Sequence, residues 1–160
     1  MRHAKSDWSL DLDSDFERPL NKRGKKDAPR MGKEMLDRKI VPDHILASTA
    51  KRAVETVEAV VKACAYQGKI NYFDDFYSGN IDSVFEQIQK LDNLYGRVLL
   101  IGHNPTWESL SELLISKDMF IEMPTSTLVS VNAYIDDWKK LEPKSCKFNW
   151  LIKPRELMEF

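Results

Sequence analysis

The sequence predicts an α/β fold in which helices cover both faces of a mostly parallel sheet. Two observations carry this prediction. Short apolar runs alternate along the chain with segments of helical periodicity, the pattern of parallel strands joined by crossover helices. One run, VLLI at residues 98–101, is apolar throughout, as expected of a strand buried on both faces. We expect a single domain over residues 1–160, because the chain contains no repeat, low-complexity tract or linker.

The first half of the chain predicts a helix followed by a strand and a second helix. Apolar residues at helical spacing predict the first helix over residues 27–38. Residues 44–47 (HILA) form a short apolar run typical of a buried strand. Ser48 and Thr49 follow as candidate caps for a helix that extends over about residues 50–67.

The rest of the chain predicts three further strands besides VLLI. Residues 70–73 (INYF) are expected to be a strand, and residues 81–91 show the apolar spacing of a helix. Asn104 can cap a helix that follows the VLLI run. Apolar residues alternate over residues 129–135 and again over residues 148–152, which predicts an antiparallel pair at one edge.

Composition excludes several classes of function. Apolar residues make up 42% of the chain and charged residues 31%, a composition typical of a folded protein. A net charge of −1 supplies no field that would bind nucleic acid. No apolar run approaches the roughly 20 residues that span a membrane, so we expect a cytoplasmic protein without membrane contact. Two distant cysteines indicate neither a disulfide framework nor a zinc site.

Arg52 and His103 each follow a predicted strand, at the sheet edge where ligands of such folds bind. Arg52 lies in the first turn of its helix, where the helix dipole disfavours a cation unless an anion lies nearby. The ordinary alternatives are an exposed surface arginine and a hydrogen-bonded structural histidine. His44 begins a strand at the opposite edge, and we interpret it as structural.

Arg2 and His3 stand at the start of the chain, where a frayed terminus is the default interpretation. Together with Arg52 and His103 they would supply two guanidiniums and two imidazoles, a set that suits a phosphate dianion. An arginine guanidinium can donate hydrogen bonds to two phosphate oxygens at once, and a neutral imidazole can attack phosphorus. The guanidinium charges lower the imidazole pKa and neutralise charge on the phosphoryl oxygens, so we expect no metal ion and no cofactor.

Four blocks in this order resemble the histidine phosphatase superfamily. They are RHAKSDW at 2–8, RPLNKRG at 18–24, STAKRA at 48–53 and GHNP at 102–105. The blocks agree in order and spacing with the short SixA-type phosphohistidine phosphatases. The resemblance implies a three-layer α/β sandwich of the phosphoglycerate mutase-like type and a phosphohistidine intermediate.

The resemblance also implies roles for individual residues. His3 would be the nucleophile, Arg2 and Arg52 would bind the transferred phosphoryl group, and His103 would donate a hydrogen bond to it. Arg18 would lie near the pocket mouth and help to bind phosphate or substrate, with an exposed surface arginine as the alternative.

The chain departs from the family pattern in its first strand. In this family a central strand ends at the RHA motif, and Met1 stands where the last residue of that strand would be. We therefore expect the sheet to lack its first strand, and the sequence to begin about one strand late.

The general acid is also unassigned. Asp74 and Asp75 follow the strand at 70–73 and are positional candidates, although ordinary loop acids would look the same. A phosphohistidine needs little acid help, because its imidazole leaves readily. Only about fifty residues separate Arg52 from His103, too few for a large lid, so we expect a shallow, open pocket.

These observations favour a metal-independent phosphatase that acts on phosphohistidine in a phosphorylated protein. Two alternatives stay open: a phosphatase for small phosphomonoesters in the same superfamily, and a phosphate-binding module without turnover. The sequence predicts neither the physiological substrate nor the oligomeric state.

Overall fold

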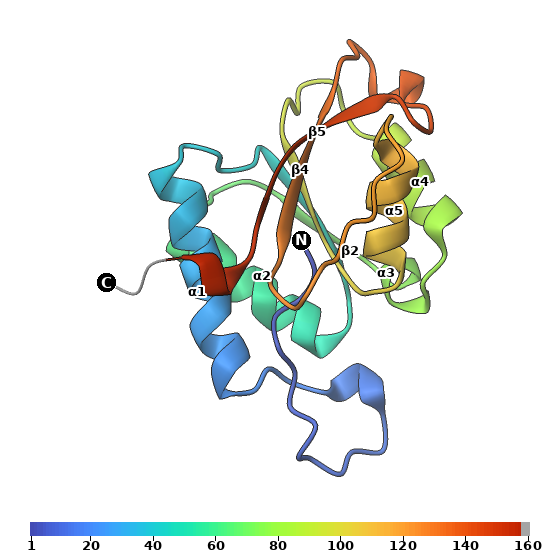
Figure 1. Cartoon of the computed structure of the whole chain (residues 1–160). Coiled ribbons are helices and arrows are strands. Elements are labelled where there is room, and N and C mark those ends of the chain that lie inside the picture. The colour runs from blue at the N-terminus through green and yellow to red at the C-terminus, as the bar shows by residue number, and fades with distance from the viewer. Residues whose placement is uncertain (158–160) are drawn as a thin grey trace.

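The structure, a computed structural model, describes residues 1–157 (Figure 1). Helices and strands alternate along most of it. In chain order, the elements are η1 (Asp15–Glu17), α1 (Lys22–Asp37), β1 (His44–Ser48), α2 (Lys51–Ala63), β2 (Ile70–Phe73), α3 (Asp75–Ser78), α4 (Ile81–Gln89), β3 (Val98–Ile101), α5 (Thr106–Leu114), β4 (Leu128–Ala133), η2 (Trp138–Lys140), β5 (Cys146–Ile152) and η3 (Pro154–Glu156).

The strands form a parallel sheet and a separate antiparallel pair. In the parallel sheet β1 lies in the centre, with β2 on one side and β3 on the other. The register sets Ile45 opposite Ile70 and Leu99. The antiparallel pair consists of β4 and β5, with a register shift next to Ser130. The parallel sheet and the antiparallel pairing of the last two strands are confirmed, but the predicted place of that pair at an edge of the sheet is wrong, because β4 and β5 form a sheet of their own.

Helices cover both faces of the parallel sheet, which makes three layers. Ile45 and Ala47 of β1 pack with Val57 of α2 in one apolar cluster, to which α1 also contributes. Leu46, between them in the strand, packs on the opposite face with Phe76 of α3 and with residues of α4 and α5. Because successive strand residues point to opposite faces, a continuously apolar strand serves both clusters.

Some helix ends differ from their predicted positions because of local hydrogen bonds and backbone turns. Helix α1 begins at Lys22 rather than at residue 27, because the Asn21 side chain accepts a hydrogen bond from the Gly24 N–H and caps it. Helix α2 ends before residue 67, where Ala65 turns into the left-handed region at φ 55°. Asn104 does not cap α5: its amide donates instead to the Met123 carbonyl.

The chain start lies beside the end of β3. The Met1 ammonium donates to the Leu100 carbonyl, and Arg2 forms an isolated parallel bridge with Gly102. Within residues 1–157, β3 pairs with no named strand on the side away from β1. A cavity of about 580 Å³ lies there, lined by residues of β3 and β4.

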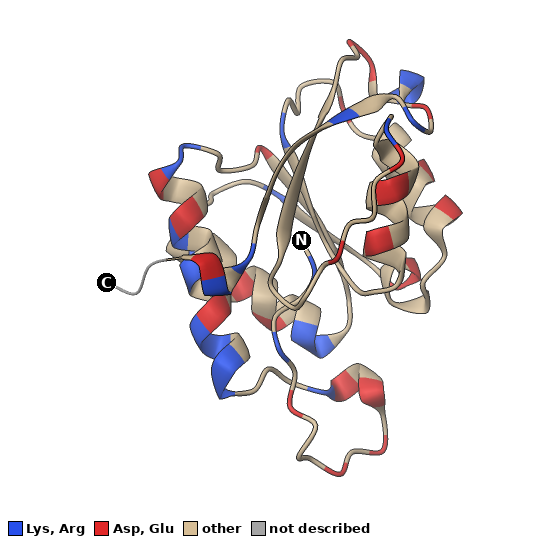
Figure 2. Ribbon diagram, in the orientation of Figure 1, with Lys and Arg blue, Asp and Glu red and all other residues tan. Residues whose placement is uncertain are grey.

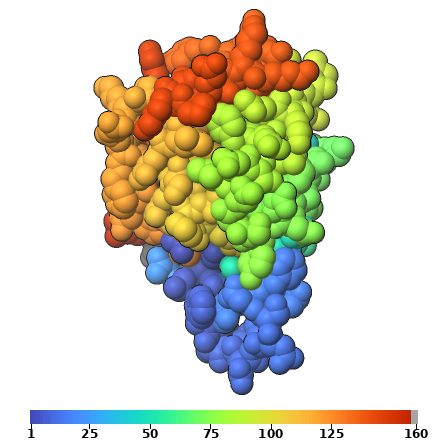
Figure 3. All heavy atoms as spheres, turned by 90° about the vertical axis from the view of Figure 1, so that its right-hand side faces the viewer, coloured from blue at the N-terminus to red at the C-terminus, as the bar shows by residue number. Residues whose placement is uncertain are grey.

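Residues 7–17 form a loop that ends in the short helix η1. The N-terminal part of the chain, blue in Figure 3, makes up the narrow end of the molecule below α3, α4 and α5. The loop contains five carboxylates and no lysine or arginine, and Figure 2 shows its red segments at that end. No helix in the described part of the chain is long and apolar enough to cross a membrane.

Candidate active site

His3 is tied by its backbone to the end of the parallel sheet. Its N–H donates to the Gly102 carbonyl at 2.9 Å, and its carbonyl accepts from the Ser126 N–H at 3.1 Å. The next residue, Ala4, donates its N–H to Thr56 Oγ1 of α2 at 3.0 Å. The RHA segment is therefore positioned by β3 and α2, although it belongs to no strand or helix.

The ring contacts of His3 determine which nitrogen carries the proton. Nδ1 lies 2.7 Å from the Ala4 carbonyl, and the Arg52 Nε donates to Nε2 at 3.3 Å. Because a guanidinium can only donate, Nε2 must hold the lone pair and Nδ1 the hydrogen. Burial, together with the smaller effects of the Arg52 and Arg2 charges, lowers the pKa of His3 to about 4. At neutral pH the site therefore presents an unprotonated, nucleophilic nitrogen.

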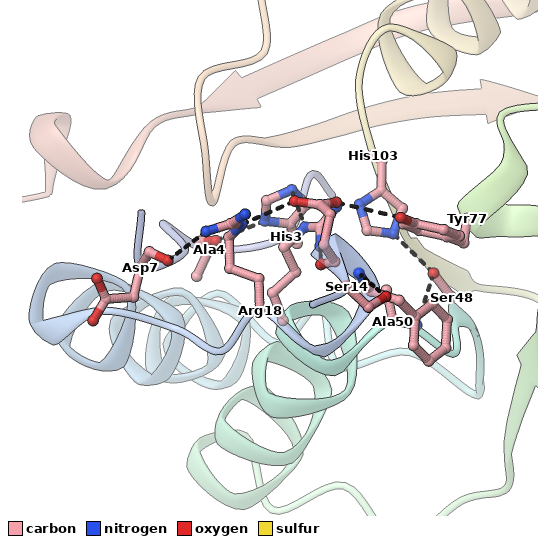
Figure 4. Close-up of polar contacts among 12 residues, drawn as sticks. His3, Ala4, Asp7, Ser14, Arg18, Ser48, Ala50, Tyr77 and His103 are labelled. Carbon is pink, nitrogen blue, oxygen red and sulfur yellow. Dashed lines mark hydrogen bonds and ion pairs between the residues drawn. The ribbon is translucent and has the colours of Figure 1, made fainter. Parts of the chain in front are cut away.

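His103, just after β3, is the second imidazole of the site. Its ring centroid lies 4.9 Å from that of His3, and Figure 4 shows the two rings side by side, between Arg18 and Tyr77. Burial, followed by the neighbouring His3 and Arg52, lowers the pKa of His103 to about 3. Both imidazoles are therefore neutral near pH 7.

Ser48 orients the His103 ring. The Ser48 Oγ lies 2.8 Å from His103 Nε2 and accepts the Ala50 N–H. When the hydroxyl donates its own hydrogen to Nε2, the ring proton lies on Nδ1. Nδ1 is buried and has no hydrogen-bond partner among residues 1–157. His103 can therefore donate a hydrogen bond to an anion placed beside it.

Two guanidiniums contribute directly to the cluster. Arg52, only 8% exposed, donates through Nη1 to the Asp15 carbonyl at 2.8 Å and through Nη2 to the Asp15 carboxylate at 3.0 Å. Arg2 donates to the Met123 carbonyl at 2.9 Å, and its buried Nε has no partner in the described part of the chain. The surface-arginine alternative for Arg52 is therefore wrong.

Arg18 joins the same group of side chains and is also buried. Its Nε donates to the Asp15 carboxylate at 2.9 Å, and its Nη1 donates to the Asp7 carbonyl at 3.0 Å. The guanidinium lies 3.9 Å from the centre of the Trp8 ring, within range for a cation–π contact. The structure thus brings together all five residues predicted for the site.

Asp15 is the site residue that sequence reasoning missed. Its carboxylate accepts hydrogen bonds from both Arg18 and Arg52, and the Tyr77 hydroxyl donates to it at 3.3 Å. The hydrogen bond from Arg18 is the largest of the effects that lower the pKa of Asp15. The only sequence signal is the position of Asp15, three residues before Arg18 in DFER.

The two acids proposed from the sequence have other partners. Asp74 accepts a hydrogen bond from the Thr49 hydroxyl, and Asp75 accepts one from the Ser83 hydroxyl. His44 stacks on Tyr95 at the opposite end of β1, as expected of a structural histidine. Residues 1–157 contain no group of three or more His, Cys, Asp or Glu side chains that could hold a metal ion.

The prediction of a shallow, open pocket is wrong, because most side chains of the site are buried. His3, His103, Arg52 and Arg18 are all between 7 and 9% exposed. Asp15 contacts both arginines, and Tyr77 packs edge-on against His103 at 5.6 Å. The segment that sequence reasoning overlooked is the loop at residues 7–17, which lies before Arg18 rather than between Arg52 and His103.

Comparisons with known proteins find similarity to one family of phosphatases. The model of the histidine phosphatase superfamily (branch 1) matches residues 1–76. The structure is similar to the protein histidine phosphatase SixA complexed with tungstate, with a TM-score of 0.85 and 26% identity over 99% of this chain and 97% of that chain. A SixA protein from Agrobacterium tumefaciens gives a TM-score of 0.82 and 29% identity over 96% and 95% of the two chains.

A protein from Mycobacterium tuberculosis is 28% identical over 152 residues, which cover 89% of this chain and 92% of that protein. The family match begins at the segment that carries Arg2 and His3 and includes Arg18 and Arg52. The structural similarity extends over the remainder, including His103. The first 76 residues thus match the model of the histidine phosphatase superfamily, and the chain as a whole has the fold of the SixA structures.

Proposed function

We propose that this phosphatase removes the phosphoryl group from phosphohistidine on another protein, without a metal ion, through a phosphohistidine intermediate on His3. One observation carries the proposal. His3 presents an unprotonated Nε2 to the Arg52 guanidinium, in a buried cluster that also holds Arg2 and His103. An imidazole lone pair among fixed donors suits attack on a phosphoryl group.

In the first step His3 Nε2 attacks phosphorus, and the bond from phosphorus to the substrate nitrogen breaks. Arg2 and Arg52 bind the phosphoryl oxygens, and His103 donates its Nδ1–H to one of them. These donors are already in place, so they stabilise the developing charge without rearrangement. Loss of one such donor typically costs about a hundredfold to a thousandfold in kcat.

In the second step water attacks the phosphorus, the bond to His3 Nε2 breaks, and inorganic phosphate is released. The hydrogen bond from Nδ1 to the Ala4 carbonyl serves both steps. It keeps the proton away from Nε2, and it stabilises the positive charge that the ring acquires when it is phosphorylated.

A protein-bound phosphohistidine is the substrate that this chemistry favours. The imidazole of a phosphohistidine leaves more readily than an alkoxide, so it depends less on a strong general acid. The similar structure described as a protein histidine phosphatase acts, by its name, on the same class of substrate.

The test compares turnover of a phosphohistidine-containing protein with turnover of sugar phosphates by the full chain. We expect clear preference for the phosphoprotein, and loss of activity in His3→Asn but not in the matched variant His44→Asn. Brief incubation with a labelled phosphodonor should yield an acid-labile, base-stable adduct. Preference for sugar phosphates, or an adduct that persists in His3→Asn, would reject the proposal.

A further inference from the structure

The Asp15 carboxylate occupies a position that suits a phosphate. It accepts hydrogen bonds from Arg52 Nη2 at 3.0 Å and from Arg18 Nε at 2.9 Å. Arg52 also donates through Nε to the proposed nucleophilic nitrogen of His3. One guanidinium thus links the carboxylate to the reacting atom. An incoming phosphoryl group must compete with Asp15 for this guanidinium.

We propose that Asp15 is the proton-transfer residue of the site, and this assignment rests on the function proposed above. The phosphoryl oxygens take over Arg52, and the displaced carboxylate keeps its bond to Arg18 at the edge of the bound anion. From there it gives a proton to the leaving group in the first step and recovers one from water in the second.

The proton balance closes over one turnover. In the first step Nε2 of His3 bonds to phosphorus, the bond to the leaving atom breaks, and the carboxylic acid of Asp15 protonates that atom. In the second step Asp15, now a carboxylate, accepts a proton from the attacking water as the phosphorus–Nε2 bond breaks. His3 returns to its neutral form, and Asp15 is again protonated.

The surroundings of Asp15 fit both halves of this cycle. Arg18, Arg52 and the Tyr77 hydroxyl face the carboxylate and favour its ionised form. A phosphate dianion would draw away the charge of Arg52 and place negative charge beside Asp15, which favours the protonated form. The side chain is 41% exposed, so it can exchange protons with solvent.

Other carboxylates near the site are held elsewhere. Asp74 and Asp75 are hydrogen-bonded to hydroxyl groups of Thr49 and Ser83. Glu108 interacts with the charge of Arg2, but it accepts the Met123 N–H at 2.8 Å. Asp15 is the only carboxylate in the described residues that contacts both Arg52 and Arg18.

The experiment measures kcat/KM of the full chain for aryl phosphates whose phenols span a wide range of acidity. Asp15→Asn keeps the shape of the side chain and removes its proton, and Asp74→Asn is the matched control. Inhibition by inorganic phosphate is measured for each protein. For Asp15→Asn we expect a loss of about a hundredfold or more with the least acidic phenol and under about fivefold with the most acidic.

Phosphate should inhibit Asp15→Asn at least as strongly as wild type, because a competing anion is removed. Uniform loss over the whole series together with weaker phosphate inhibition would indicate a purely structural role and overturn the assignment. A leaving-group dependence that appears in Asp74→Asn instead would move the proton donor to Asp74. Absence of turnover by the wild-type chain with every substrate, phosphohistidine included, would overturn the proposed function as well.

Discussion

The two buried imidazoles predict that the protein loses stability as the solution is acidified. Burial lowers the pKa of His3 to about 4 and that of His103 to about 3, from 6.5 for an unperturbed imidazole. Below pH 6.5 the unfolded chain therefore binds two protons that the folded site does not. The stabilisation is fully present above pH 6.5 and declines as the pH falls toward 4.

The size of the effect follows from the difference in pKa. At a pH of about 5, the pKa of each imidazole in the unfolded chain lies about 1.5 units above the solution pH. Each pKa unit corresponds to about 1.4 kcal/mol. Each imidazole thus removes about 2 kcal/mol of stability, and the pair about 4 kcal/mol, relative to neutral pH. This is a large fraction of the roughly 5–15 kcal/mol that holds a typical domain folded.

Urea unfolding near neutral pH and at a pH of about 5 measures the effect in wild type and in the double variant His3→Gln/His103→Gln. Other groups also titrate, among them the buried Met1 ammonium, whose pKa burial lowers to about 5. These groups are common to both proteins, so the comparison isolates the imidazoles. We expect wild type to lose about 4 kcal/mol more than the variant. Equal pH dependence in the two proteins would refute the claim that both imidazoles are buried and neutral.

Three further predictions concern the residues around the imidazoles. Arg52→Lys keeps the positive charge but loses the hydrogen bond to His3 and the ability to bind two phosphate oxygens at once. The inhibition constant of phosphate should therefore rise about tenfold or more, and an unchanged constant would contradict phosphate binding by Arg52. Ser48→Ala removes the hydrogen-bond partner that orients the His103 ring, so in steady-state kinetics kcat should fall about tenfold while KM changes little. A change in KM alone would contradict the orienting role of Ser48. Gly102→Ala would bring a Cβ to 2.3 Å from the Trp107 ring. The free energy of unfolding, measured with urea, should fall by about 1–3 kcal/mol. An unchanged free energy would show that the Trp107 ring moves aside without cost.

Much of the fold could be predicted because the strands carry local signals. HILA and VLLI are mostly apolar runs, and they form β1 in the centre of the parallel sheet and β3 beside it. The same logic placed Arg52 and His103 at one sheet edge, since parallel strands present their carboxyl ends together. Helix ends were less predictable, because a side chain such as Asn21 can cap a helix at any of several neighbouring positions.

Asp15 could not be predicted, because its role depends on contacts distant in the sequence. Nothing in DFER indicates that the loop folds back onto Arg52, which is 37 residues away. The Tyr77 hydroxyl reaches the same carboxylate from 62 residues away. Asp74 and Asp75 were the plausible acids by position, yet the hydroxyls of Thr49 and Ser83 hold them. Partners of this kind follow from the packing of the loop, which sequence periodicity does not encode.

The most direct test of the central claim is a crystal structure of the protein bound to phosphate or tungstate. We expect one tetrahedral anion beside His3 Nε2, hydrogen-bonded to Arg2, Arg52 and His103 Nδ1, with Asp15 displaced from Arg52. An anion that binds elsewhere and leaves the Asp15–Arg52 contact intact, or one that touches neither imidazole, would contradict it.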